Sequence, residues 1–172
     1  MKKLLVALMV VLSTGAIAQI KLGHVDSQKL LDTMPSRKAA IETLQKFEKD
    51  GVQELTEMRE DFQKKVIVYQ QKVQAGTMNP MMAKMEEEAL QKKQYNIEER
   101  QQDLESQMQT LTQSLNDPIL DRLERAVKIV GDRKKLGYVL EITNTLYYGG
   151  GTDITDEVAK ELLILDNKET VK

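Results

Sequence analysis

The feature that most constrains the fold is a pair of helical patterns on either side of residues 76–80. Apolar residues recur at steps of three and four, the period of an amphipathic helix, before and after this segment. Asn79 suits a helix cap, and Pro80 suits the first helical position, where a missing N–H costs nothing. The chain is therefore predicted to turn back here between two long helices. The apolar positions are Ile41, Leu44, Phe47, Val52, Leu55, Met58, Phe62, Val66, Tyr69 and Val73 before the turn, and Met82, Met85, Ala89, Ile97, Leu104, Met108, Leu111 and Leu115 after it.

The two predicted helices also match each other in register. Folding the chain back at the turn pairs positions whose residue numbers sum to about 155, which sets Met58 beside Ile97. Pro35 and Pro118 then fall at nearly the same distance from the turn, so both helices are expected to break there. At 1.5 Å rise per residue each helix is about 60 Å long. Residues 36–116 are therefore predicted to form a helical hairpin arm that is too long to be a compact core.

The first residues have the pattern of a secretory signal peptide. A start with two lysines precedes an apolar run too short to span a bilayer, and Ala16-Ile17-Ala18 is a small-x-small cleavage site. Residues 1–18 are therefore predicted to be removed, so that the mature chain begins at Gln19. The chain has no cysteine, and a signal peptide without a disulfide framework favours the bacterial periplasm. No later run is apolar enough for a membrane span, so the exported product is predicted to be soluble.

Charge and composition exclude some partners. Removing the signal peptide takes away Lys2 and Lys3, which leaves 23 basic residues against 27 acidic ones, a net charge of −4. A nucleic acid partner is not expected, because an acidic chain is repelled by the phosphate backbone. Charged residues make up 30% of the chain and aromatic residues 4%, which suits long exposed helices and leaves little for a large core.

The segments on both sides of the arm, residues 19–35 and 117–172, are predicted to form one small body. Its short strands cannot make a stable isolated sheet, and their edges favour pairing with other chains. The fold class is therefore predicted to be α+β, mostly α, with copies of the chain pooling their strands; Val25, Val139, Leu140, Ile142 and Tyr147 are the candidate oligomerisation residues. The expected elements are a strand at 20–26, a short helix capped by Asp26 or Ser27, a helix from Pro118 that Gly137 ends, strands at 138–142 and 146–148, and a helix capped by Asp153 or Thr155 that ends near Leu165.

Catalytic and cofactor chemistry have little support in this sequence. The chain has no cysteine and one histidine, His24, so a soft-metal site is not expected. The glutamates at 86–88 follow one another on a helix and therefore point in different directions around its axis. Gly149-Gly150-Gly151 lacks the Lys-Ser/Thr pair that completes a phosphate loop. The chain is therefore predicted not to be an enzyme, and no cofactor or metal is expected.

Several segments together resemble the periplasmic Skp/OmpH-type chaperones of Gram-negative bacteria. The resemblance covers essentially all of the predicted mature chain, and Asp153-Ile154-Thr155 is its most specific local match. The other matching stretches are Gly23-His24-Val25-Asp26-Ser27, the helical hairpin, Ala126-Val127-Lys128 and Tyr138-Val139-Leu140 through Tyr148.

This resemblance implies a fold and a function. It implies a jellyfish-like homotrimer with a β-rich body and three helical arms around a cavity. It also implies an ATP-independent holdase that binds unfolded outer-membrane proteins and prevents their aggregation during outer membrane protein biogenesis. The best-known members are strongly basic, whereas this chain is acidic.

The candidate client-binding residues lie near the turn of the arm. Met is flexible and polarizable, which suits a surface that accepts many apolar partners. Met82 and Met85 are expected on the seam between the helices, whereas Met78 and Met81 are freer to contact a client. Helix packing is the alternative role for all four methionines. Ile67, Val68 and Tyr95 fall beside the regular seam and are the other candidates.

The outer half of the arm, residues 62–93, carries six lysines against three glutamates. This excess of positive charge favours weak contact with an acidic client or an anionic membrane surface, in a manner that salt weakens. The competing hypothesis is an envelope adaptor or structural protein whose hairpin binds one folded partner helix to helix.

Overall fold

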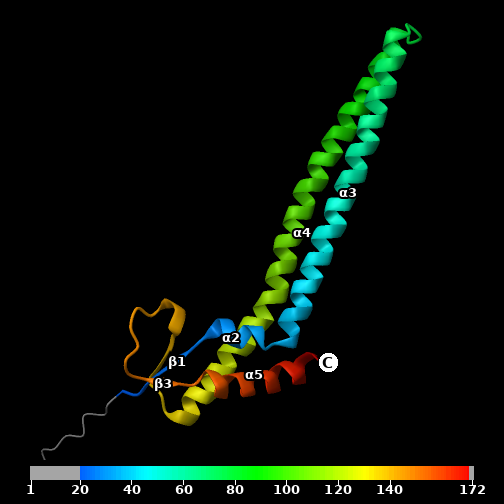
Figure 1. Cartoon of the computed structure of the whole chain (residues 1–172). Coiled ribbons are helices and arrows are strands. Elements are labelled where there is room, and N and C mark those ends of the chain that lie inside the picture. The colour runs from blue at the N-terminus through cyan, green and yellow to red at the C-terminus, as the bar shows by residue number, and fades with distance from the viewer. Residues whose placement is uncertain (1–19, 171–172) are drawn as a thin grey trace, which may run out of the picture. The chain divides into compact units, whose positions relative to one another are not determined.

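The computed structural model describes residues 20–170, so the predicted signal peptide lies outside the described residues. Long helices and one small sheet make up the fold, which confirms the predicted mostly helical α+β class (Figure 1). The chain divides into two compact units. The described residues up to Thr33 and Glu124–Leu165 form the sheet unit, and Met34–Leu123 with the residues from Asp166 on form the hairpin unit. The elements in order are β1 (Leu22–Val25), α2 (Ser27–Asp32), α3 (Pro35–Gln74), α4 (Pro80–Lys134), β2 (Tyr138–Glu141), the 3-10 helix η1 (Ile142–Asn144), β3 (Thr152–Asp153) and α5 (Thr155–Thr170).

The predicted turn between the two long helices is confirmed. Helix α3 ends at Gln74, and Gly76 takes a positive φ of 66° that a residue with a side chain rarely adopts. Helix α4 then begins at Pro80, and the side chain of Asn79 accepts a hydrogen bond from the Met82 N–H at 2.8 Å. The helices run side by side away from this turn (Figure 1).

The predicted register of the hairpin is confirmed as well. A Cβ added to Gly51 would lie 3.3 Å from Leu104, and the numbers of these two residues sum to 155. The guanidinium of Arg100 donates to both carboxylate oxygens of Glu54, each at 2.9 Å. This bidentate pair lies one turn farther along the same seam, so apolar packing and charge pairing agree on one alignment.

The predicted helix break at Pro118 is wrong, because α4 continues through this proline to Lys134. A proline inside a helix leaves the carbonyl four residues earlier without its N–H partner. Here that carbonyl belongs to Ser114, and both residues are exposed, so water can satisfy it. Ile119, which is 4% exposed, packs on the buried side of the same turn. The packing of Ile119 therefore outweighs the cost of the exposed proline before it.

The sheet has three parallel strands in the order β2-β1-β3. The predicted strand at residues 146–148 is wrong: the chain leaves β2 through η1, and the third strand is Thr152–Asp153. Tyr147 is 84% exposed and lies in the loop between them. Strand β1 is central, and its Gly23 allows close packing, since a Cβ there would lie 2.5 Å from Leu136.

The core of the sheet unit lies where α4 and α5 pack with α2 and β1. Helix α4 does not end at Gly137 as predicted; Lys135 takes the left-handed conformation, with φ 53°. Gly137 serves a close approach instead, because its N–H donates to the Lys21 carbonyl at 2.8 Å and a Cβ there would lie 2.6 Å from Ile20. The buried apolar residues of this unit are Val25, Leu30, Ala126, Val130, Ile154, Val158 and Leu162.

Glu141, at the end of β2, links this strand to the start of α2. Its carboxylate accepts a hydrogen bond from the Ser27 N–H at 3.1 Å and another from the Thr143 hydroxyl at 3.1 Å. Burial acts to raise the pKa of Glu141, but the hydrogen bonds from Ser27 and Thr143 outweigh it and hold that pKa below its usual value. The ionised carboxylate therefore stabilises the fold.

Replacing this residue in Glu141→Gln is expected to lower the free energy of unfolding at pH 7 by about 1 kcal/mol. Because the folded pKa is depressed, the carboxylate stabilises the protein above its unfolded pKa, and this stability is lost as the pH falls through the folded value. Thermal unfolding from acid to neutral pH checks this: the difference between the wild type and the variant should vanish in acid. Glu124→Gln, at an exposed position, is the control, and an equal effect of both substitutions would contradict the role of Glu141.

The end of α5 belongs to the hairpin unit, and α5 runs to Thr170 instead of ending near Leu165 as predicted. Asp166 is fully buried there, with Arg122 Nε 3.2 Å from its Oδ1. Its Oδ2 accepts a hydrogen bond from the Ser36 N–H at 3.0 Å. The N-cap of α3, Met34, has no side-chain acceptor, so Asp166 supplies one from a distant part of the chain.

Candidate functional site

Large apolar side chains are exposed on the hairpin mainly between residues 67 and 95. Met81 is 75% exposed and Met85 is 63% exposed, although both are large enough to fill a core. The part of the hairpin nearer Pro35 exposes Ile41, Val52 and Leu120. Clustered exposure of this kind is typical of a surface that binds apolar partners. We call the cluster the outer apolar surface; it consists of Ile67, Val68, Val73, Met81, Met82, Met85 and Tyr95.

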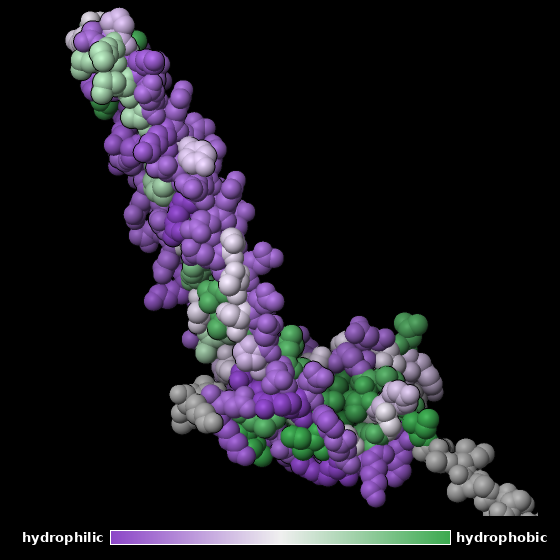
Figure 2. Space-filling model, turned by 180° about the vertical axis from the view of Figure 1, so that it is seen from behind, coloured by the Kyte–Doolittle hydropathy of each residue, from purple (hydrophilic) through white to green (hydrophobic). Residues whose placement is uncertain are grey.

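The space-filling view shows where apolar side chains reach the surface of the hairpin. On the face in Figure 2 the hairpin is mainly hydrophilic, with apolar colour around the turn that joins its two helices and in smaller patches along its length. The surface of the sheet unit on that face also carries apolar patches. The exposed apolar side chains of the hairpin therefore lie among charged ones and do not form one broad apolar face.

The outer apolar surface is exposed because charged residues occupy the seam beside it. Lys72 Nζ donates to Glu86 Oε1 at 2.6 Å, and Lys93 Nζ donates to Asp61 Oδ2 at 2.6 Å. The expectation that Met82 and Met85 lie on the seam is therefore wrong. Glu86, Leu90 and Lys93, which are half-buried, follow the helical period that leads to the buried Ile97.

The pKa values along this seam reflect the same pairing. The hydrogen bond from Lys93 holds the pKa of Asp61 below its usual value, and the same bond raises the pKa of Lys93. Farther toward the turn, Tyr69 donates to Glu87 Oε1 at 2.6 Å, which raises the pKa of the Tyr69 hydroxyl. These groups keep their ordinary charge states at neutral pH, so the seam is fixed by hydrogen-bonded charges as well as by packing.

The sequence-predicted client-binding residues are unequally placed. Ile67, Val68, Met81 and Tyr95 are exposed, whereas Met78 is half-buried at the turn. Sequence reasoning missed the exposure of Val73, Met82 and Met85, which it placed on the apolar faces of the two helices. Two charge pairs could have indicated this exposure. Lys72 with Glu86 and Asp61 with Lys93 fit the predicted register nearly as well as the apolar pairs do, so charged residues could be expected on the seam in place of the methionines.

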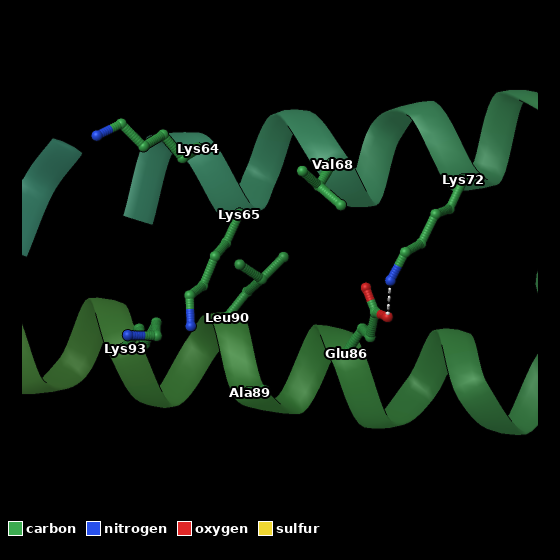
Figure 3. Close-up of a pocket in the computed structure, with 8 residues that line it drawn as sticks. All are labelled: Lys64, Lys65, Val68, Lys72, Glu86, Ala89, Leu90 and Lys93. Atoms are coloured by element: carbon green, nitrogen blue, oxygen red, sulfur yellow. Dashed lines mark hydrogen bonds and ion pairs between the residues drawn. The ribbon is translucent and has the colours of Figure 1, made fainter. Parts of the chain in front are cut away.

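A cavity of about 370 Å³ opens between α3 and α4 in the outer half of the hairpin (Figure 3). Val68 and Leu90 point into it from the two helices, and Lys65 reaches across from α3 toward α4. Four lysines stand at the edges of the cavity, although the Lys64 side chain in Figure 3 lies along α3 and not across the gap, and Glu86 pairs with Lys72. The lining residues are Lys64, Lys65, Val68, Lys72, Glu86, Ala89, Leu90 and Lys93.

The candidate oligomerisation residues lie in the sheet unit and differ in exposure. Val25 is buried within the chain, and Val139 and Ile142 are half-buried. Leu140 and Tyr147 are exposed, together with the neighbouring Tyr138, Leu146 and Tyr148. These residues leave an apolar area at the β2 edge of the sheet and in the loop that follows it.

His24, the histidine of the chain, lies in β1 of the sheet unit. His24 Nε2 lies 4.0 Å from Asp153 Oδ2, and the His24 ring is 5.2 Å from that of Tyr148. Within residues 20–170, no group of three His, Cys, Asp or Glu side chains is arranged to hold a metal ion. None of the helices described there is long and apolar enough to cross a membrane.

A protein-family model described as "Outer membrane protein (OmpH-like)" matches residues 21–162, which is most of the chain. The chain belongs to this OmpH-like family. The match includes the hairpin and the sheet, so the OmpH-like assignment rests on both units and confirms the resemblance found in the sequence.

Two relatives of this OmpH-like chain are named "Chaperone protein Skp". The protein from Photorhabdus laumondii is 28% identical, and the one from Photorhabdus luminescens is 27% identical. Each alignment covers 94% of this chain and 99% of the relative. The OmpH-like chain is thus similar over nearly all of its length to proteins named as chaperones.

A solved structure also resembles the OmpH-like chain. It is a putative outer membrane chaperone (OmpH-like) from Caulobacter crescentus, with a TM-score of 0.73 and 18% sequence identity. The match covers 91% of this chain and 89% of that one. At this identity the likeness shows the fold, which agrees with the long helices and small sheet described above.

Proposed function

We propose that this OmpH-like protein is an ATP-independent holdase chaperone of the periplasm, which binds unfolded outer-membrane proteins and prevents their aggregation. The observation that carries the proposal is the outer apolar surface, where Ile67, Met81 and Met85 are each more than half exposed. Membership of a family with relatives named as chaperones supports the same function. We infer export from the N-terminal pattern in the sequence.

Binding in this proposal relies on many weak contacts. Separate apolar side chains on a charged rod can each bury one client side chain and then release it. Met81, Met82 and Met85 adapt to different apolar partners because their side chains are unbranched and polarizable. Several such contacts on one chain raise the effective concentration of the others, so binding is firm overall while each contact is weak. Release then follows when the client folds elsewhere, and no nucleotide is needed.

Assembly completes the proposed chaperone. We propose that residues 19–35 and 117–172 form an oligomerisation body, that residues 36–116 form a client-binding arm, and that the protein is a homotrimer. The exposed apolar residues at the β2 edge, Leu140 and Tyr147 among them, support such an interface. Three hairpins in one assembly would surround a client and multiply the weak contacts.

Dilution of a urea-unfolded outer-membrane β-barrel protein, followed by light scattering, tests this function. We expect the exported form of the protein to suppress aggregation near equimolar trimer and client, without ATP. Unrelated unfolded barrel proteins should be protected as well. An absence of suppression, with a fixed complex formed with one folded envelope protein, would support the adaptor hypothesis and contradict the proposal.

A further inference from the structure

We propose that the cavity between α3 and α4 in Figure 3 binds a client segment in which a carboxylate stands beside an apolar side chain. This inference rests on the proposed holdase function and names the client feature that this part of the hairpin selects. A second cavity of the hairpin, of about 430 Å³, lies beside Val52 and Leu104 and has no lysine in its lining. In the cavity of Figure 3, by contrast, four lysines surround the exposed apolar residues.

The apolar part of the ligand is indicated by the floor of the cavity. Val68 is 47% exposed, and it faces Leu90 across the gap in Figure 3. The volume of about 370 Å³ is enough for one or two side chains of a bound segment. Covering Val68 and Ala89 removes apolar area from water, which favours an aliphatic or aromatic side chain over a polar one.

The carboxylate is indicated by the charge balance around that floor. The four lining lysines pair with three carboxylates, because Asp61 is shared between Lys65 and Lys93. The lysines therefore exceed the carboxylates by one positive charge, and a single carboxylate of the bound segment would balance it. A segment with several carboxylates would exceed the available charge, and a neutral apolar segment would leave the lysines unused.

Two of the lysines are loosely held. Lys64 lies 4.0 Å from Glu60, and Lys65 lies 3.9 Å from Asp61, with both ends of each pair more than half exposed. Exposed pairs of this length contribute little stability, so either lysine can turn to a ligand at small cost. Lys72 and Lys93, in contrast, are held by hydrogen bonds of 2.6 Å. Lys64 and Lys65 are therefore the groups that bind the carboxylate of the client segment.

Fluorescence anisotropy with two labelled, unstructured peptides tests the assignment. One peptide carries Glu between two Leu residues in a Gly/Ser background, and its twin carries Gln in place of Glu. We expect the wild type to bind the Glu peptide about threefold to fivefold more tightly. Lys64→Gln with Lys65→Gln should reduce this preference to about equal affinity, with circular dichroism showing an unchanged helix content.

Lys84→Gln with Lys92→Gln is the matched control, because both lysines are exposed in the same half of the hairpin and neither lines the cavity. This variant should keep the preference for Glu. Equal affinity of the wild type for both peptides, or an equal loss of preference in the two double variants, would overturn the assignment. If the wild type suppresses client aggregation but shows no preference, only the cavity assignment fails; if it suppresses none, the proposed function fails first.

Discussion

Replacing Ile67 and Val68 with Ser is expected to weaken binding of an unfolded barrel client by about tenfold. Both side chains belong to the outer apolar surface, and about half of each is exposed. A client that covers them gains the free energy of burying apolar area, which a serine hydroxyl does not give. Adding Met81→Ser and Met85→Ser should raise the loss to about a hundredfold. The measurement is client affinity by fluorescence quenching or anisotropy.

The hairpin offers a control matched in residue type. Ile41 and Val52 are also exposed, but they lie on the other half of α3, outside the outer apolar surface. Ser has nearly the same helix propensity as Ile and Val, so neither double variant should alter the helix. We expect Ile41→Ser with Val52→Ser to change client affinity by less than about twofold. An equal loss in both double variants would contradict a localised site.

Removing the carboxylate of Asp166 is expected to have the largest effect on stability. Asp166→Ala should lower the free energy of unfolding by about 3 kcal/mol, because the buried guanidinium of Arg122 loses its buried carboxylate partner and keeps the more exposed Glu169, 3.5 Å away. The Arg122 side chain is 9% exposed, so water reaches it poorly. The same substitution removes the acceptor for the Ser36 N–H at the start of α3. Urea unfolding followed by circular dichroism measures the loss.

Two further variants show whether the cause is the buried charge. Asp166→Leu combined with Arg122→Met removes both charges and should recover much of the lost stability. Asn167→Ala, at an exposed position of α5, should change the free energy of unfolding by less than about 0.5 kcal/mol. If Asp166→Ala were as mild as Asn167→Ala, the ion pair would not stabilise the hairpin unit.

Local patterns predicted the hairpin well. The turn chemistry of Asn79 and Pro80 and the repeated apolar spacing are short-range signals, and both the turn and the register are as expected. Pro118 misled the prediction because a break signal in sequence says nothing about the packing of its buried neighbour, Ile119. The far end of α5 depends on Asp166 meeting Arg122, a contact between distant segments that no local pattern shows.

The sequence predicted which part of the hairpin carries the candidate site, but it did not predict all of the residues that are exposed there. Ile67, Val68, Met81 and Tyr95 were identified because they fall off the apolar period, and they are exposed. Met85 was assigned to the seam because it continues the spacing of the apolar residues after the turn. In the structure Glu86 is paired with Lys72 across the helices, and this leaves the methionine to solvent. The cavity with its lysines required both helices to be placed side by side, which the sequence alone did not do.

Site-specific photo-crosslinking to an unfolded client tests the central claim most directly. A benzophenone amino acid placed at position 67 or 81 should give crosslinks to an unfolded outer-membrane barrel protein under conditions where its aggregation is suppressed. The same group at position 41 or 52 should give few. Crosslinks that arise only from positions 41 and 52, or equally from all four, would contradict a chaperone that holds its client on the outer apolar surface.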